Sequence, residues 1–214
     1  MILKLRKGEL EKLIPAVATG KQFNAASGDP RKILQRLMVS SIGGVITLLI
    51  SQSQVTSQFY PFWLLLGVSC LLYILWGPIL EASRKNAEVR RLPVSALFEG
   101  EVINIFTKEK IENRHEQANK KGELELVENR RTWIFLEIGD EDGYLTEIKF
   151  PLESKHQLIR TGSLVRLIIF SNNSRFESII KTSDAWFPRE KLWAGSYPYL
   201  LRPAFEELCY YRFR

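Results

Sequence analysis

Residues 37–80 contain no Asp, Glu, Lys, Arg or His, a run of 44 positions without a formal charge. Two apolar stretches lie within it, Leu37–Ile50 and Phe59–Leu80, joined by the polar but uncharged linker Ser51–Gln58. Crossing the hydrocarbon core of a bilayer takes about 20 apolar residues, and the second stretch reaches that length alone. A helix on the surface of a soluble protein shows a polar face, which this run lacks. The pattern therefore predicts a two-helix transmembrane hairpin.

The basic side chains lie outside this run, on both of its flanks. Residues 1–36 carry eight Lys or Arg against three acidic residues, and residues 81–95 carry four against two. The formal net charge of +6 thus arises beside the apolar run, and the residues from Ala96 onward are close to neutral. Because loops on the cytoplasmic side are rich in Lys and Arg, the sequence predicts that both termini face the cytoplasm or stroma.

Local signals set the ends and the packing of the hairpin. Asp29 followed by Pro30 is typical of a helix N-cap and first turn, so the first helix should begin there and carry Arg36 at the headgroup level. Gly77 and Pro78 predict a bend where the second helix leaves the membrane. Small residues should pack the hairpin on itself, with docking against a partner's helices as the alternative: these are Ser40, Ser41, Gly43, Gly44, Gly67 and Ser69.

We divide the sequence into four segments. Residues 1–32 form an N-terminal cytoplasmic segment, in which apolar residues at helical spacing between positions 8 and 18 predict a short amphipathic helix on lipid headgroups. A loop is expected at Gly20–Gly28. Residues 33–92 hold the hairpin and a helical stalk that ends before Pro93. Residues 93–183 form a β domain, and residues 184–214 an aromatic-rich tail.

Short runs of alternating hydrophobicity mark the β domain. Asp140–Gly143 (DEDG) is a tight-turn sequence, residues 153–160 fit a short helix, and the charge-rich residues 107–130 are expected to form a solvated excursion. Three strands, a short helix and two strands follow the order of an OB-like barrel, closed or half-closed, although an SH3-like barrel would give similar signals. The predicted strands are Leu97–Phe106, Arg131–Ile138, Tyr144–Leu152, Leu164–Phe170 and Ser178–Lys181, with an extra strand at Glu123–Val127.

The predicted fold class is therefore an α+β membrane protein, in which a two-helix transmembrane hairpin is followed by a small OB-like β-barrel. Trp133 and Phe135 share one face of their strand while Ile134 and Leu136 share the other, so something must cover the outer face. We expect the C-terminal tail there rather than nucleic acid, because an oligonucleotide groove needs a positive charge that this domain lacks.

The tail supplies the candidate contacts. Its aromatic residues, together with arginines, suit a protein contact or a membrane interface, although about half of them should pack against the barrel. The candidate partner or membrane-surface contacts are Trp186, Phe187, Trp193, Tyr197, Tyr199 and Arg202.

Sequence motifs of enzymes are missing. His115 and His156 belong to no metal-ligand motif, and no phosphate-binding loop, nucleophile elbow or CxxC occurs. Cys70 and Cys209 are separated by a change of environment, so no disulfide is expected. The prediction is a chain without catalytic residues, cofactor or metal site. Transport by the hairpin alone is not expected either, since no charged residue lines it.

Three stretches resemble a known family: LWGPILEASRKNAEVRR (75–91), GELELVENRRTWIFLEIGDEDG (122–143) and KTSDAWFPREKLWAGSYPYLLR (181–202). They look like cyanobacterial and plastid two-span membrane proteins that are often labelled "phosphate ABC transporter permease". The resemblance covers most of the chain. It implies a photosynthetic membrane, the thylakoid or the plasma membrane, whereas two spans do not suit a permease.

The leading functional hypothesis is a non-enzymatic, membrane-anchored assembly or scaffold factor. Its partners would be a larger integral-membrane complex, by analogy a photosynthetic one, and the lipid bilayer, but no nucleic acid. The alternative is an accessory subunit of a membrane transporter. A membrane-tethered nucleic-acid binder is a third hypothesis, and it predicts strongly salt-dependent binding.

Overall fold

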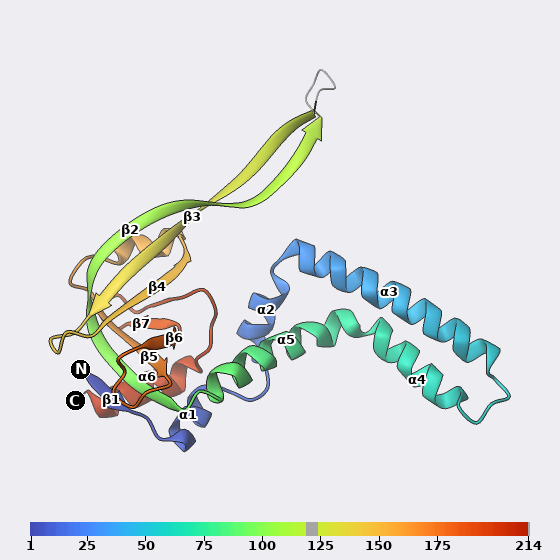
Figure 1. The fold of residues 1–214 in the computed structure, drawn as a ribbon, viewed down its shortest axis with the longest axis horizontal. Helices are drawn as coiled ribbons and strands as arrows, with labels where there is room; N and C mark the ends of the chain where they lie inside the picture. The colour runs from blue at the N-terminus through green and yellow to red at the C-terminus, as the bar shows by residue number, and fades with distance from the viewer. Residues whose placement is uncertain (119–123, 214) are drawn as a thin grey trace. The chain divides into compact units, whose positions relative to one another are not determined.

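The structure, a computed structural model, describes residues 1–118 and 124–213 (Figure 1). The chain divides into two compact units. The helical unit comprises residues 14–91, and the α+β unit comprises residues 1–13 together with the residues from 92 onward. The protein is therefore of the α+β class, and its sheet is antiparallel.

The helical unit holds α2 (Gly20–Ser27), α3 (Pro30–Ser53), α4 (Tyr60–Leu71) and α5 (Tyr73–Arg90). The Asp29 carboxylate accepts a hydrogen bond from Arg31 N at 3.0 Å, which confirms the predicted start of the first long helix. The loop predicted over residues 20–28 is wrong, because Thr19 and Gln22 form a reciprocal capping box that begins α2. α5 ends before Pro93, as predicted.

Small residues hold α3 and α4 together as an antiparallel hairpin. The Ser40 hydroxyl on α3 donates to carbonyl oxygens at the end of α4. A Cβ atom added at Gly44 would clash with the Leu71 side chain, and one added at Gly67 would lie 2.8 Å from Leu48 Cδ2. The prediction that small residues pack the hairpin on itself is confirmed at these positions. The small residues that are exposed instead are Ser41 and Ser69.

The second apolar stretch is not the single helix that was predicted. It breaks at Leu72, where α4 and α5 are bent by 73°. At the break, side chains donate hydrogen bonds to carbonyl groups that would otherwise accept from the next helical turn. The Ser40 hydroxyl donates to the Cys70 and Leu71 oxygens, and Trp76 Nε1 donates to the Ser69 oxygen at 2.9 Å. Gly77 and Pro78, where a bend was predicted, both lie inside α5, which continues through them to Arg90.

Among the described residues, one continuous helix is long and apolar enough to cross a membrane. This helix is α3, judged by its length and composition. The α4 and α5 helices reach the same standard only when they are counted together across their bend.

The α+β unit is built on one sheet with the strand order β4-β3-β2-β5-β7-β8, in which β1 also pairs with β2 and β6 with β5. All five strands that were predicted as separate elements are present, and the short helix appears as a 3-10 turn, Ser154–Leu158. The bounds are β1 (Ile2–Lys4), β2 (Val94–Ala118), β3 (Leu124–Gly139), β4 (Leu145–Pro151), β5 (Leu164–Ser171), β6 (Ile179–Thr182), β7 (Ala185–Phe187) and β8 (Leu192–Ala194).

The sheet is open, so the closed form of the predicted OB-like barrel is wrong. None of the strand pairings that the structure describes joins β4 to β6, the two strands that would have to meet. The β6 strand is only four residues long and its register with β5 shifts between Phe170 and Ser171. The chain then turns into β7, which continues the sheet beside β5 instead.

The β2 and β3 strands extend beyond the core as a two-stranded arm (Figure 1). The predicted excursion over residues 107–130 is therefore strand wherever it is described, and ion pairs such as Arg131–Glu112, at 3.2 Å, join the two strands. The predicted extra strand at Glu123–Val127 is part of β3, and Glu123 itself lies outside the described residues. The turn at Asp140–Gly143 is confirmed, with Gly143 at a φ of 83°.

Apolar side chains are buried on both faces of the sheet. The inner core includes Phe98, Leu136, Leu167 and Phe187. On the opposite face, α6 (Arg202–Arg212) contacts Trp193 of β8 through Phe205, with 5.5 Å between ring centroids. Both cores belong to the α+β unit.

The N-terminal helix α1 (Lys7–Leu13) belongs to the α+β unit as well. Its Leu10 and Leu13 side chains are buried, Leu201 N donates to Leu13 O at 2.8 Å, and Arg212 pairs with Glu9 at 2.6 Å. The predicted amphipathic helix on lipid headgroups is therefore wrong, because Leu10 and Leu13 are used in protein packing and the helix ends before Val17.

Candidate functional site

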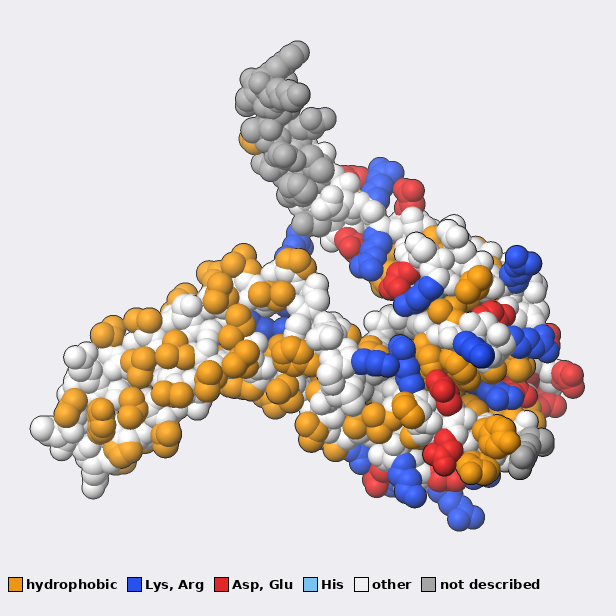
Figure 2. Space-filling model, turned by 180° about the vertical axis from the view of Figure 1, so that it is seen from behind, with side chains coloured by type: hydrophobic (Ala, Val, Ile, Leu, Met, Phe, Trp, Pro, Cys, Tyr) orange, Lys and Arg blue, Asp and Glu red, His pale blue; other side chains and the backbone are white. Residues whose placement is uncertain are grey.

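The surface of α3, α4 and the first half of α5 is apolar around most of its circumference. The buried positions of α3 are small or polar, while its large aliphatic side chains point outward. The outer part of the helical unit shows hydrophobic side chains and no acidic or basic ones in Figure 2. The exposed large hydrophobic residues are Ile33, Leu34, Leu37, Met38, Val39, Ile42, Val45, Ile46, Leu49, Val55, Phe59, Phe62, Leu64, Leu65, Leu66, Val68, Leu71, Leu72, Leu75, Trp76, Ile79 and Leu80.

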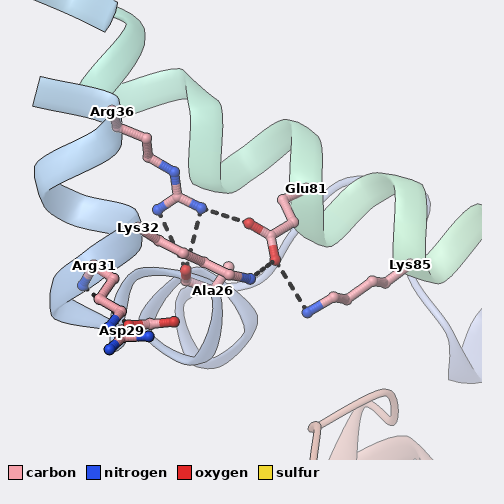
Figure 3. Close-up of polar contacts among 7 residues, drawn as sticks. All are labelled: Ala26, Asp29, Arg31, Lys32, Arg36, Glu81 and Lys85. Carbon is pink, nitrogen blue, oxygen red and sulfur yellow. Dashed lines mark hydrogen bonds and ion pairs between the residues drawn. The ribbon is translucent and has the colours of Figure 1, made fainter. Parts of the chain in front are cut away.

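A charged cluster lies where this apolar surface ends (Figure 3). The Glu81 carboxylate on α5 pairs with Lys32 at 2.6 Å, with Arg36 at 2.5 Å and with Lys85 at 3.2 Å. The Arg36 side chain is only 8% exposed, and its two terminal nitrogens also donate to the Ala26 carbonyl at 3.3 and 3.2 Å. Three cations share one carboxylate, so the cluster keeps a net positive charge.

This pairing was missed from the sequence, although a signal for it exists. Arg36 and Glu81 are the first charged residues on either side of the charge-free run. In an antiparallel hairpin the two flanks of such a run return to the same end, so opposite charges there should meet. The pairing fixes where the two limbs of the hairpin come together.

A groove of about 660 Å³ opens beside the cluster and is lined by both basic and aromatic side chains. Tyr73 and Trp76 line it and pack edge to face, with 4.8 Å between ring centroids. Arg84 and Lys85 line it from the next turns of α5. Aromatic and basic side chains together at the border of an apolar surface are typical of a membrane–water interface.

The six candidate contact residues of the tail lie in the α+β unit, and most of them are buried. Phe187 is fully buried in the core, so its prediction as a surface contact is wrong. Trp193, Tyr197 and Tyr199 are 8%, 7% and 7% exposed. Only Trp186 and Arg202 keep an intermediate exposure. The tail is therefore mainly a packing element, as was expected for about half of its aromatic residues.

Tail aromatics and arginines stack across the outer face of the sheet. Trp186 of β7 stacks on its cross-strand neighbour Trp193, at 5.3 Å between ring centroids, and the Arg202 guanidinium lies 5.2 Å from the Trp193 centroid. The Trp193 indole N–H donates to Glu206 on α6 at 2.9 Å. These contacts hold α6 against the sheet and explain the aromatic composition without a ligand.

Asp184, between β6 and β7, is a buried carboxylic acid. Its Oδ1 accepts a hydrogen bond from Leu200 N at 3.0 Å, while Oδ2 has no hydrogen-bond partner among the described residues. Burial raises the pKa of Asp184 to about 7, against the opposing effects of that hydrogen bond and of Arg202. A Cβ atom added at Gly195 would lie 2.9 Å from Asp184 Cα, so this acid is part of a tightly packed turn.

Two further chemically reactive groups of the α+β unit, His156 and Cys209, also serve packing. His156 packs edge to face on Phe150 and its Nδ1 accepts from Glu153 N at 3.1 Å, and burial lowers the pKa of His156. Burial raises the pKa of the Cys209 thiol to about 12. Within the described ranges, no group of three or more His, Cys, Asp and Glu side chains lies close enough to hold a metal ion. The His115 side chain lies outside the description.

The outer face of β3 is covered differently from the prediction. Phe106 of β2 stacks on Phe135, at 5.1 Å between ring centroids, and Lys110 Nζ lies 5.6 Å from the Trp133 ring. The tail strands β7 and β8 instead add Phe187 and other residues to the inner core. The expectation that the C-terminal tail covers Trp133 and Phe135 is therefore wrong, because lysine side chains and a neighbouring strand fill that role.

Comparison with known proteins gives a family and no activity. No curated protein and no solved structure matches the chain. The resemblance to two-span membrane proteins of photosynthetic organisms therefore stays a prediction. One protein-family model matches residues 3–212, which is nearly the whole chain, so this protein belongs to a family of unknown function, DUF8619.

Proposed function

We propose that this protein is a membrane-anchored assembly or scaffold factor. Its helical unit inserts into a lipid bilayer, and its α+β unit binds a larger integral-membrane complex. One observation carries the proposal: the large apolar side chains of α3, α4 and early α5 point outward. Soluble proteins rarely expose a contiguous apolar patch of more than about 300–600 Å².

The burial of α3 supports a lipid environment over the core of a soluble protein. Only 17% of the residues in its most apolar window are buried. A buried core helix would have most of this window covered by protein. The residues of α3 that are covered are Arg36, Ser40, Gly44 and Ser51, which suits helix packing in a membrane, where small and polar residues meet at the interface.

The second limb of the hairpin, which is α4 with the first turns of α5, ends at the level at which the first limb, α3, begins. The α4 helix, with its 12 residues, rises about 18 Å, which is too short to cross about 30 Å of hydrocarbon. The apolar first turns of α5 lead from the 73° bend at Leu72 to Glu81. Since Glu81 pairs with Arg36 and Lys32, both limbs start and end at one charged level, and the α4–α5 limb acts as a broken span.

The charge distribution orients the hairpin. The cluster of Lys32, Arg36 and Lys85 lies at the end where both flanks meet, whereas the connection between α3 and α4 carries no charged residue. The positive-inside rule then places both flanks on the cytoplasmic or stromal side. The resemblance to cyanobacterial and plastid proteins makes a thylakoid membrane, or a plasma membrane, the proposed location.

A scaffold role without catalysis fits how the α+β unit uses its side chains. Asp184, His156 and Cys209 have shifted pKa values, and each is explained by burial within a packed region. These three side chains are used in packing, so binding is the function that the unit supports best.

The proposal is tested by purifying the tagged chain from its native membrane in a mild detergent, at native expression. An integral-membrane protein complex should co-purify in stoichiometric amount. Replacing residues 37–80 by an unrelated two-span hairpin should keep that partner, because the α+β unit makes the contact. Recovery of the chain alone would contradict the scaffold role, and co-purification of transporter subunits would support the accessory-subunit alternative instead.

A further inference from the structure

One long edge of the sheet is left without a partner. Among the described strands, β4 pairs only with β3. The hydrogen bonds Leu152 N to Thr132 O and Asp140 N to Tyr144 O identify the even-numbered residues of β4 as those whose backbone bonds β3. The backbone groups of Leu145, Glu147 and Lys149 therefore point away from β3, toward the open side.

A second free edge belongs to β6, which pairs only with β5 in the described sheet. The bond from Ser183 N to Ile168 O and the register Phe170 with Lys181 show that the odd-numbered residues of β6 bond β5. The backbone groups of Ile180 and Thr182 therefore point to the other side.

These two edges form the opposite walls of one groove. Its volume is about 450 Å³, within the range of about 300–1,000 Å³ that is typical of binding pockets. Residues 145–149 of β4 line one wall and residues 179–183 line the other, with Gly195, Ser196, Tyr197 and Tyr199 closing one side. The groove is thus bounded by peptide groups that can still donate and accept hydrogen bonds.

The strand directions suit a single inserted strand. Since β4, β3, β2, β5 and β6 follow one another in antiparallel pairs, β4 and β6 run in the same direction. One strand that runs opposite to them would be antiparallel to both neighbours and would close the sheet into a barrel. Ile148 and Ile179, which contact the inner core, would then be covered by every second side chain of that strand.

We propose that an extended segment of a partner protein inserts between β4 and β6, antiparallel to both. The segment carries apolar side chains at alternate positions, which face the core, and polar ones between them, beside Glu147 and Lys149. Strand addition to an exposed edge is a common mode of peptide recognition, in which main-chain bonds give affinity and alternate side chains give specificity.

A partner's segment fits this edge better than a second copy of this chain does. A second copy could offer β4 or β6, and each of these is already bonded to a neighbouring strand on its other side. Neither could therefore pair with both walls of the groove, whereas a free extended segment can. Leu145, at 68% exposed, and Ile180, at 48%, remain as apolar contacts for the incoming strand.

This inference deepens the proposed scaffold function, because it names the part of the partner that is bound. The two can fail separately, since strand addition is measured on amides of β4 and β6 and does not depend on insertion of the helical unit into a bilayer.

The test uses the full-length chain in lipid nanodiscs and a nine-residue peptide selected on it from a random display library. Hydrogen exchange is measured with and without that peptide. Without it, the amides of Leu145, Glu147 and Lys149 should exchange at least about 100-fold faster than those of Thr146 and Ile148, which bond β3. With it, the three fast amides and those of Ile180 and Thr182 should become protected.

A matched pair of variants isolates the edge amide. Glu147→Pro removes the outward N–H, as Pro151 already does further along β4, whereas Glu147→Ala keeps it. The proline variant should bind the peptide about tenfold more weakly, and the alanine variant should bind like the wild type. Thr182→Pro and Thr182→Ala repeat the comparison on the other wall.

Three results would overturn the proposal. The first is a selection that returns no peptide dependent on these amides, and the second is a peptide that protects other amides only. The third is a dimer whose edge amides are already protected without peptide, since the occupant would then be a second copy of this chain.

Discussion

The α+β unit buries its large apolar side chains, whereas the helical unit exposes most of them. In the α+β unit, large residues such as Phe98, Leu136 and Phe187 are inside and charged residues outside. In the helical unit, Ile46 and Leu65 are outside, while Ser40 and Gly44 are covered. Both arrangements follow from one rule, burial of apolar surface away from water, if the solvent around the helical unit is lipid.

The largest expected difference between the units comes from truncating one apolar side chain in each. Phe187→Ala should destabilise the α+β unit by about 3–5 kcal/mol, because a fully buried ring leaves a cavity. Leu65→Ala, at a position 67% exposed, should change the helical unit by no more than about 0.5 kcal/mol. Native-state hydrogen exchange in nanodiscs reports each unit separately. An equal loss of stability from the two substitutions would contradict the claim that one unit buries its apolar side chains and the other exposes them.

The pH dependence of stability sharpens the comparison within the α+β unit. The pKa of Asp184 is about 7 in the folded chain and near the ordinary aspartate value when unfolded, so the folded state holds the proton more tightly. The contribution of Asp184 to stability should therefore fall by up to about 4 kcal/mol as the pH rises from about 4 to about 7, and should level off above that.

The control for this effect keeps the hydrogen bond and removes the charge. Asp184→Asn can still accept from Leu200 N, and its stability should lose this pH dependence, whereas Asp142→Asn at the exposed turn should keep it. Chemical denaturation across pH 4–8 measures both. The same pH dependence in the wild type and in Asp184→Asn would contradict the buried, proton-holding state.

Helix packing in the helical unit should be sensitive to the smallest side-chain additions. Gly44→Ala adds a Cβ atom that clashes with the Leu71 side chain, and it should cost about 1–3 kcal/mol through overpacking. Gly8→Ala on α1 meets nothing within 4 Å and should stabilise the α+β unit by about 0.5–1 kcal/mol. Exchange rates of α3 and α4 amides in nanodiscs would show the difference, and an unaffected Gly44→Ala hairpin would argue against close α3–α4 contact.

The charged cluster should matter more than an ion pair at the surface. Glu81→Gln leaves the Arg36 side chain, 8% exposed, without its carboxylate, and it should destabilise the helical unit by about 1–3 kcal/mol. Glu177→Gln breaks a pair with Arg175 whose side chains are 83% and 63% exposed, and its effect should be at most about 0.5 kcal/mol. A comparable effect of the two substitutions, measured by thermal unfolding in nanodiscs, would mean that Arg36 is solvated.

The sequence predicted the elements whose signals are local. The DEDG turn, the Asp29 cap and the five strands follow from residue types that act on their own backbone. The α2 helix was missed because its start depends on a capping box, Thr19 with Gln22, inside a polar stretch. The break at Leu72 was missed because it depends on Ser40, which lies 32 residues earlier in the sequence.

The candidate contacts in the tail failed for a related reason. Phe187 and Trp186 are neighbours in a strand of three residues, and alternation over so short a strand does not tell which side chain is inside. Burial of Phe187 was decided by the sheet order, which brings β7 beside β5. The open edge between β4 and β6 likewise depends on tertiary pairing and has no local signal.

Membrane insertion of the helical unit is the central claim, and a matched pair of substitutions tests it most directly. Ile46 and Ile103 are both 52% exposed, the first on α3 and the second on β2. A lysine in the middle of a membrane span costs about 2.5–3.5 kcal/mol, whereas one at a water-exposed position costs little. Alkaline carbonate extraction of native membranes should leave the wild type and Ile103→Lys in the pellet and should release a larger fraction of Ile46→Lys. Release of the wild-type chain into the supernatant as a compact monomer would contradict the account.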